Sequence, residues 1–181
     1  MAEDKRIVPY QPLDLKEPVE LVAAVRKRRG GQLINLDRML LHSAPFARGW
    51  NQFLGEVRNN LSLDPKLREI AMCGVAVLNG AEYEFFHHAP VFLEAGGTQA
   101  QVDALRLIGQ APMPSGLFST LEEDVLELIV QMTRQIKVDL QLQERLQMAL
   151  GNTCLVELTV VIATYNMVSR FLVALSVTPE H

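Results

Sequence analysis

The chain has 181 residues, of which 49% are hydrophobic and 6% aromatic, and its formal net charge at pH 7 is −4. This length suits one domain, and the mixed, slightly acidic charge excludes the basic surface typical of nucleic-acid-binding proteins. Runs of Val, Ile and Thr are scarce, whereas apolar residues recur at three- and four-residue spacing. That period predicts an all-α fold.

The cysteine content and the N-terminus bear on the compartment. Cys73 and Cys154 lie far apart and form no CxxC motif, which argues against a disulfide framework, a dithiol redox motif and a zinc motif. The first residues are charged and are followed by prolines, so we expect no signal peptide. These features favour a cytoplasmic protein.

One apolar run, from Cys154 to Leu175, is long enough to cross a membrane. Glu157 and Arg170 interrupt it, and a charged side chain near the bilayer centre costs about 2.5–3.5 kcal/mol. We therefore expect no membrane span, but a buried helix that is shared with another subunit.

Prolines, glycines and capping residues divide the chain into expected elements. Residues 1–17 contain two prolines and no helical period, which predicts an extended N-terminal arm before a single helical domain over residues 18–181. Ser43, Asp64 and Asp139 are candidate helix caps, and Ser119 and Thr120 each begin a possible capping box. The expected helices cover residues 19–29, 36–41, 44–59, 65–78, 81–95, 98–107, 120–136, 139–151 and 153–176.

The helices on either side of Asn79-Gly80 carry the candidate chemistry. Glu84 and His88 lie four residues apart and therefore on one face of the second helix. If the two helices fold back antiparallel about the break, Glu69 of the first helix falls opposite His88. A histidine between two carboxylates suits proton transfer near neutral pH.

Other interpretations of this cluster remain open. A Glu four residues before a His is also a common helix-surface pair. Two carboxylates and a histidine can hold iron, manganese or zinc, but no second histidine is well placed, so we predict no metal and no cofactor. Cys73 follows Glu69 by one turn and is either a reactive thiol or a small buried hydrophobe.

The residues around this cluster resemble a known family. The stretches Leu67–Ala71, Leu78–His88, Glu157–Thr159 and Tyr165–Phe171 are similar to those of the carboxymuconolactone decarboxylase and alkylhydroperoxidase D-like family, over roughly residues 40 to 175. The resemblance implies an all-helical bundle built around an antiparallel helix pair, which assembles as a homo-oligomer, as a trimer or hexamer.

The peroxidase branch of this family uses a glutamate, a CxxC pair and a histidine as a proton relay. By position the glutamate corresponds to Glu69 and the histidine to His88, whereas the two cysteines correspond to Ala81 and Glu84. A dithiol peroxidase needs a thiolate nucleophile and a resolving thiol, and neither replacement supplies one. The decarboxylase branch needs no cysteine.

The resemblance implies a lyase-like enzyme that acts on a small organic acid or lactone, with Glu69, Glu84 and His88 as catalytic residues. Candidate substrate-binding residues are cations, for an anionic substrate, and phenols, for a developing oxyanion. The cations are Arg68, Arg170 and His87, and the phenols are Tyr83 and Tyr165. Two alternatives stay open: a peroxiredoxin-type antioxidant protein that uses Cys73, and a non-catalytic oligomeric ligand-binding protein.

Overall fold

The computed structural model describes residues 6–110 and 112–180, and within them it contains eight helices and no strand. The predicted all-α fold is therefore confirmed. The chain divides into two compact units, Met1–Leu61 with Ala174–His181, and Ser62–Val173, and each is described by itself. Residues 1–5 of the expected arm lie outside the described residues, and the single domain over residues 18–181 stays a prediction.

The first unit packs α1 (Val19–Arg28) and α2 (Asn35–Leu40) against α3 (Ala44–Asn59). Asp37 is buried and accepts ion pairs from Arg28 (2.9 Å) and Arg29 (3.1 Å), which join α2 to the end of α1. Ser43 stands at the N-cap of α3 as expected, and a proline lies in the first turn, but the Ser43 side chain makes no capping hydrogen bond.

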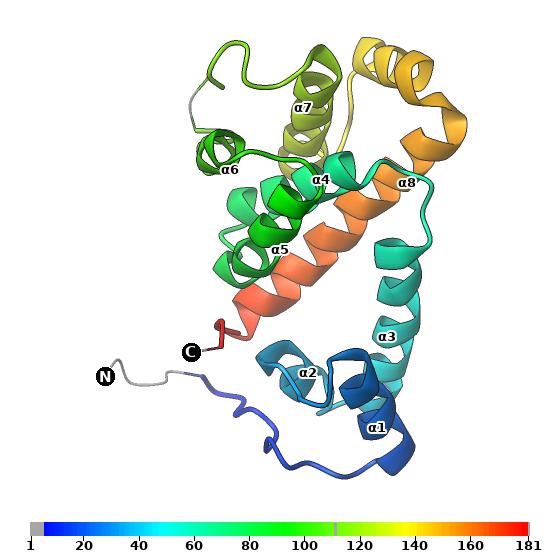
Figure 1. Ribbon diagram of the computed structural model, residues 1–181, viewed down its shortest axis with the longest axis vertical. Coiled ribbons are helices and arrows are strands. Elements are labelled where there is room, and N and C mark those ends of the chain that lie inside the picture. Colours follow the sequence, from blue (N-terminus) through cyan, green and yellow to red (C-terminus); the bar gives the residue numbers. More distant parts are fainter. Residues whose placement is uncertain (1–5, 111, 181) are drawn as a thin grey trace. The chain divides into compact units, whose positions relative to one another are not determined.

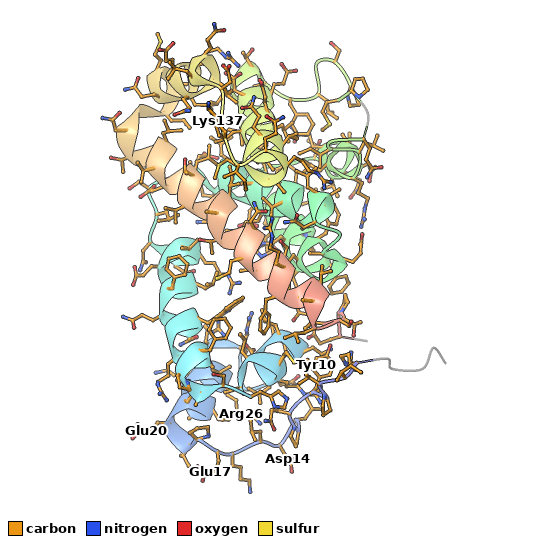
Figure 2. The ribbon with its side chains drawn as sticks, turned by 180° about the vertical axis from the view of Figure 1, so that it is seen from behind. Tyr10, Asp14, Glu17, Glu20, Arg26 and Lys137 are labelled. Carbon is orange, nitrogen blue, oxygen red and sulfur yellow. The ribbon has the colours of Figure 1, made fainter. Side chains whose placement is uncertain are left out.

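An extended segment leads into α1. Residues 6–17 contain no helix or strand, and Figure 2 labels Tyr10 and Asp14 along this segment. Arg26 of α1 donates to the carbonyl oxygens of Leu13 and Leu15, and the Tyr10 hydroxyl accepts the backbone N–H of Thr178 at 2.9 Å. These bonds fix the segment within the first unit.

The second unit is built around α4 (Pro65–Leu78), which packs against α5 (Glu82–Glu94), α6 (Gln99–Leu105) and α7 (Thr120–Arg134) (Figure 1). Side chains pack tightly against α4 at Gly74. A Cβ atom at this position would lie 3.2 Å from Ile129 Cγ2 and 3.3 Å from Ile108 Cδ1. Glycine therefore lets these side chains lie directly against the helix.

Both ends of α4 are held by polar contacts. Asp64 caps its start by accepting from the backbone N–H groups of Lys66 and Leu67, as the sequence predicts. At its end, the chain turns at Gly80 with φ +67°, a conformation that glycine adopts without strain. Asn79 donates there to Ser169 Oγ at 2.7 Å.

The long α8 (Leu140–Ala174) is interrupted at Gly151, whose φ of 73° and ψ of 171° are not helical. This matches the expected division into a helix that Asp139 caps and a final helix, and Asp139 does accept from the N–H groups of Gln141 and Leu142. By length and composition, α8 is the one helix among the described residues that could cross a membrane. This is weak evidence, because core helices of soluble proteins pass the same test.

The start of α7 is joined to α4 through Glu122. Ser119 and Glu122 form the capping box, so of the two predicted boxes the structure uses this one. Glu122 Oε1 also pairs with Lys66 Nζ at 2.7 Å. Burial alone would raise the pKa of Glu122, but the hydrogen bonds from Lys66 and from the Ser119 backbone outweigh burial and lower it.

Because the pKa of Glu122 is lower in the folded state than in the unfolded state, its ionised form stabilises the fold. That stabilisation is present above the unfolded pKa and is lost as the pH falls through the folded pKa. We expect Glu122→Gln to lower the free energy of unfolding at pH 7 by about 1–3 kcal/mol and to flatten its decline below pH 5. Urea denaturation from pH 7 to pH 3 measures both effects. Glu123→Gln, at the adjacent exposed position, is the control and should leave the pH dependence unchanged.

Candidate active site

Glu69 and His88 meet across the α4–α5 hairpin. His88 Nδ1 lies 2.7 Å from Glu69 Oε2, within the range of a charge-assisted hydrogen bond. The Glu69 side chain is 3% exposed and that of His88 is 14% exposed. Because a carboxylate only accepts hydrogen bonds, we assign the proton to Nδ1. The contact expected from folding the two helices about Asn79-Gly80 is therefore present.

The other nitrogen of His88 faces α8. Tyr165 is fully buried, and its hydroxyl lies 3.1 Å from His88 Nε2, with the two rings edge to face. With Nδ1 protonated, Nε2 accepts from the Tyr165 O–H, and on protonation of the ring the direction of this bond reverses. Glu69, His88 and Tyr165 thus form a continuous chain of hydrogen bonds that can shift a proton.

Arg68 touches the same carboxylate. Its Nε lies 3.4 Å from Glu69 Oε1, the oxygen that His88 does not use, and its side chain is 15% exposed. The sequence identified Arg68 only as one of several cations near the cluster. Its contact with Glu69 depends on the side-chain conformation, which no sequence pattern indicates.

Glu84 is also buried, at 3% exposure, in the first turn of α5. The positive end of the helix dipole favours a carboxylate there. The charges of Glu69 and Glu84 both act on Cys73, so the three side chains lie near one another inside the second unit.

Cys73 is completely buried. Burial raises the pKa of its thiol far above the ordinary value, and the negative charges of Glu69 and Glu84 raise it further, against a smaller opposite effect of Arg106. The thiolate, which is the nucleophilic form, is therefore strongly disfavoured. Of the two expected roles for Cys73, this environment favours the small buried hydrophobe.

The other predicted binding residues lie in three different settings. Tyr83 is buried, with its ring centroid 4.5 Å from that of the half-buried His87. Arg170 is exposed and donates from Nη1 to the backbone oxygen of Asn166 (2.9 Å) and to its side-chain oxygen (2.7 Å). Of the five predicted substrate-binding residues, the structure shows contacts with the Glu69–His88 pair for Arg68 and Tyr165.

A polar network beside the site joins α4, α7 and α8. Asn79 donates to Asn166 Oδ1 at 3.0 Å, and Asn166 donates in turn to Thr133 Oγ1 at 3.0 Å. Among residues 6–110 and 112–180, no group of three or more His, Cys, Asp and Glu side chains is arranged to hold a metal ion. The absence of a metal or cofactor stays a prediction.

Comparisons with known proteins support the resemblance to the family. The model of the carboxymuconolactone decarboxylase family matches residues 44–113, a segment that contains both Glu69 and His88. No curated protein matches the chain.

Two solved structures share the fold. One is an uncharacterized peroxidase-related protein from Silicibacter sp. TM1040, with 16% identity and a TM-score of 0.79 over 98% of this chain and 95% of that one. The other is an uncharacterized peroxidase-related protein from Ralstonia eutropha JMP134, described as an alkylhydroperoxidase AhpD core, with 14% identity and a TM-score of 0.73 over 90% of this chain and 86% of that one. The family match over residues 44–113 and the shared fold support the resemblance of this chain to the carboxymuconolactone decarboxylase and alkylhydroperoxidase D-like family.

Proposed function

We propose that this chain is an enzyme that transfers a proton to or from a carbon atom of a small organic acid or lactone, without a thiol. The observation that carries the proposal is the hydrogen-bonded chain Glu69–His88–Tyr165. Glu69 orients the imidazole and selects its tautomer, and His88 is the acid and base.

The chemistry fits a decarboxylation. The bond between the carboxyl carbon and the neighbouring carbon of the substrate breaks, and carbon dioxide leaves. The electron pair stays on that neighbouring carbon, where a conjugated carbonyl group of the lactone stabilises it. The protonated His88 then supplies a proton to this carbon, and solvent restores the proton to the site. No electron acceptor is required.

The difference in burial between Tyr165 and His88 suggests how substrate reaches the site. Tyr165 is closed off from solvent, whereas an edge of His88 is open. In the proposal, substrate meets the open edge of His88 and takes the place of the Tyr165 hydroxyl at Nε2, the nitrogen that delivers the proton. Glu84 is the second carboxylate with which the proton can be shared.

We expect Glu69→Gln and His88→Gln to lower the turnover number by 10²- to 10⁴-fold, the usual contribution of a general acid or base. Tyr165→Phe, which removes only the hydroxyl, should have a smaller effect. The measurement is NMR of lactone acids and keto acids incubated with the protein in D₂O, which reports both loss of the carboxyl carbon and deuterium on the carbon that carried it. Turnover that survives His88→Gln at the wild-type rate would contradict the proposal. Circular dichroism of each variant checks that the helices remain.

The main alternative is a hydroperoxide reductase, which the names of the two structural neighbours favour. Cys73, on α4, is the thiol that lies near the Glu69 carboxylate. Cys154 lies on α8 and is partly exposed. The burial and raised pKa of Cys73 oppose its use as a nucleophile.

We expect one thiol, that of Cys154, to react with a disulfide reagent at pH 7 in the native protein, and both to react in denaturant. Hydroperoxide reduction with a dithiol donor should be negligible in the wild type and unchanged in Cys73→Ser. A turnover that Cys73→Ser abolishes would establish the alternative instead. Cys154→Ala is the matched control, since it should leave no reactive thiol in the native state.

A non-catalytic ligand-binding protein is the third possibility, and in that case substitutions of Glu69 and His88 would change only stability. The expected homo-oligomer also remains a proposal. It is supported by apolar side chains that α8 exposes within the second unit, among them Met148 at 84% and Val156 at 61%. The cytoplasmic location stays a prediction.

A further inference from the structure

We infer that Asn166 is a positioning residue of the proton relay, because its carboxamide fixes the rotation of α8 that places the Tyr165 hydroxyl on His88 Nε2. This inference rests on the proposed function, since it concerns what holds one member of the same site in place. Asn166 is partly buried and follows Tyr165 directly in the chain.

The carboxamide of Asn166 uses its full hydrogen-bonding capacity. A carboxamide has two N–H donors, and its oxygen has two acceptor lone pairs. Nδ2 donates to Thr133 Oγ1 on α7 and to the backbone oxygen of Ile162, both at 3.0 Å. Oδ1 accepts from Asn79 Nδ2 at 3.0 Å and from Arg170 Nη1 at 2.7 Å. This one side chain therefore joins α8 both to α7 and to the end of α4.

The partners of Asn166 also determine which way its carboxamide faces. The backbone oxygen of Ile162 can only accept, so it requires the N–H group of Asn166. The guanidinium of Arg170 can only donate, so it requires the oxygen. Turning the carboxamide over would break both bonds. Asn166 therefore presents its oxygen to Asn79 and its N–H group to Thr133.

Tyr165 and Asn166 hold α8 from two directions, because successive residues of an α-helix point about 100° apart. Tyr165 contacts His88 on α5 at 3.1 Å, while Asn166 contacts Asn79. One such contact would let α8 roll about its own axis, whereas two contacts in different directions fix its rotation. The buried Ser169 accepts from Asn79 at 2.7 Å and holds α8 along its axis.

The Tyr165 hydroxyl is the part of the relay most sensitive to this rotation. It stands at the far end of the side chain, so a roll of α8 moves the hydroxyl further than it moves the backbone. Loss of the Asn166 bonds should therefore weaken the bond from the hydroxyl to His88 Nε2 without removing any atom of the relay.

NMR of the resting protein tests this inference without a substrate. The nitrogen chemical shift of His88 Nε2 reports whether that atom accepts a hydrogen bond, and His88→Gln identifies the signal. Tyr165→Phe gives the shift of a site without the donor. Asn166→Leu removes all four carboxamide bonds and should move the shift most of the way to the Tyr165→Phe value. Adding Asn166→Leu to Tyr165→Phe should cause no further change, because both act through the same bond.

Thr159→Val is the matched control. Thr159 is exposed on the same helix, and its hydroxyl donates to the Leu155 backbone oxygen at 2.8 Å, so this variant also removes a hydrogen bond of α8. It should leave the His88 signal unchanged. Asn166→Asp keeps an acceptor oxygen for Asn79 and Arg170 and should retain the wild-type shift.

A wild-type shift in folded Asn166→Leu would overturn the inference, and so would a change that adds to that of Tyr165→Phe or an equal change in Thr159→Val. If circular dichroism shows that Asn166→Leu does not fold, Asn79→Ala decides. It removes the contact with the end of α4 and should move the shift in the same direction, and an unchanged shift there also overturns the inference.

The shift and the turnover fail separately. The predicted shifts in a protein that decarboxylates none of the tested acids would contradict the proposed function and leave the positioning role of Asn166 standing. In a protein that does turn over, Asn166→Leu and Tyr165→Phe should lower the turnover number by the same factor, and the double variant by no more. Turnover that depends on His88 and is unaffected by Asn166→Leu, while Tyr165→Phe lowers it, would overturn the positioning role alone.

Discussion

The buried hydrogen bond between Glu69 and His88 is the constraint on which the second unit depends. A carboxylate at 3% exposure is stable only if it is hydrogen-bonded, and leaving a buried polar group without its partner typically costs about 1–3 kcal/mol, or more for a charged group. The bond joins residues 19 positions apart, so it allows only one alignment of α4 with α5. The turn between them supports this alignment, since Ala81 N–H donates to Ala76 O at 2.8 Å. The geometry that makes the hairpin fold correctly is thus the same geometry that orients the imidazole.

The final part of α8 extends this arrangement. Tyr165, Asn166 and Ser169 lie within about one helical turn, and all three make polar contacts with the hairpin. Tyr165 contacts His88. Asn166 and Ser169 contact Asn79, at the C-terminal end of α4. Figure 1 shows this half of α8 running beside α4 and α5. A helix more than seventy residues away in the sequence therefore supplies both a member of the proton relay and the support that keeps the hairpin in place.

These residues also show which features a sequence can predict. Asp64, Ser119 and Asp139 were identified as caps because a cap depends only on the next three residues. The Glu69–His88 contact was predicted because it needs only the position of one break and the helical rise. The Tyr165–His88 bond was not predicted, although Tyr165 was chosen as a hydrogen-bond donor, because it joins residues 77 positions apart through the path of α8. The contact of Arg68 with Glu69 and the raised pKa of the Cys73 thiol depend on side-chain conformation and burial, which no local pattern contains.

The chemistry proposed for this chain rests on what surrounds its cysteine rather than on the shared fold, since one fold hosts many activities. In the thiol-using branch that the sequence resembles, two cysteines stand where this chain has Ala81 and Glu84. Here both of these positions are buried, and Glu84 brings a second carboxylate near Cys73. Two negative charges around a buried thiol oppose a thiolate, yet the same charges are suited to holding and moving a proton. The residues that stand in place of the two cysteines therefore disfavour peroxidase chemistry at this site and, in the proposed function, favour acid–base chemistry at His88.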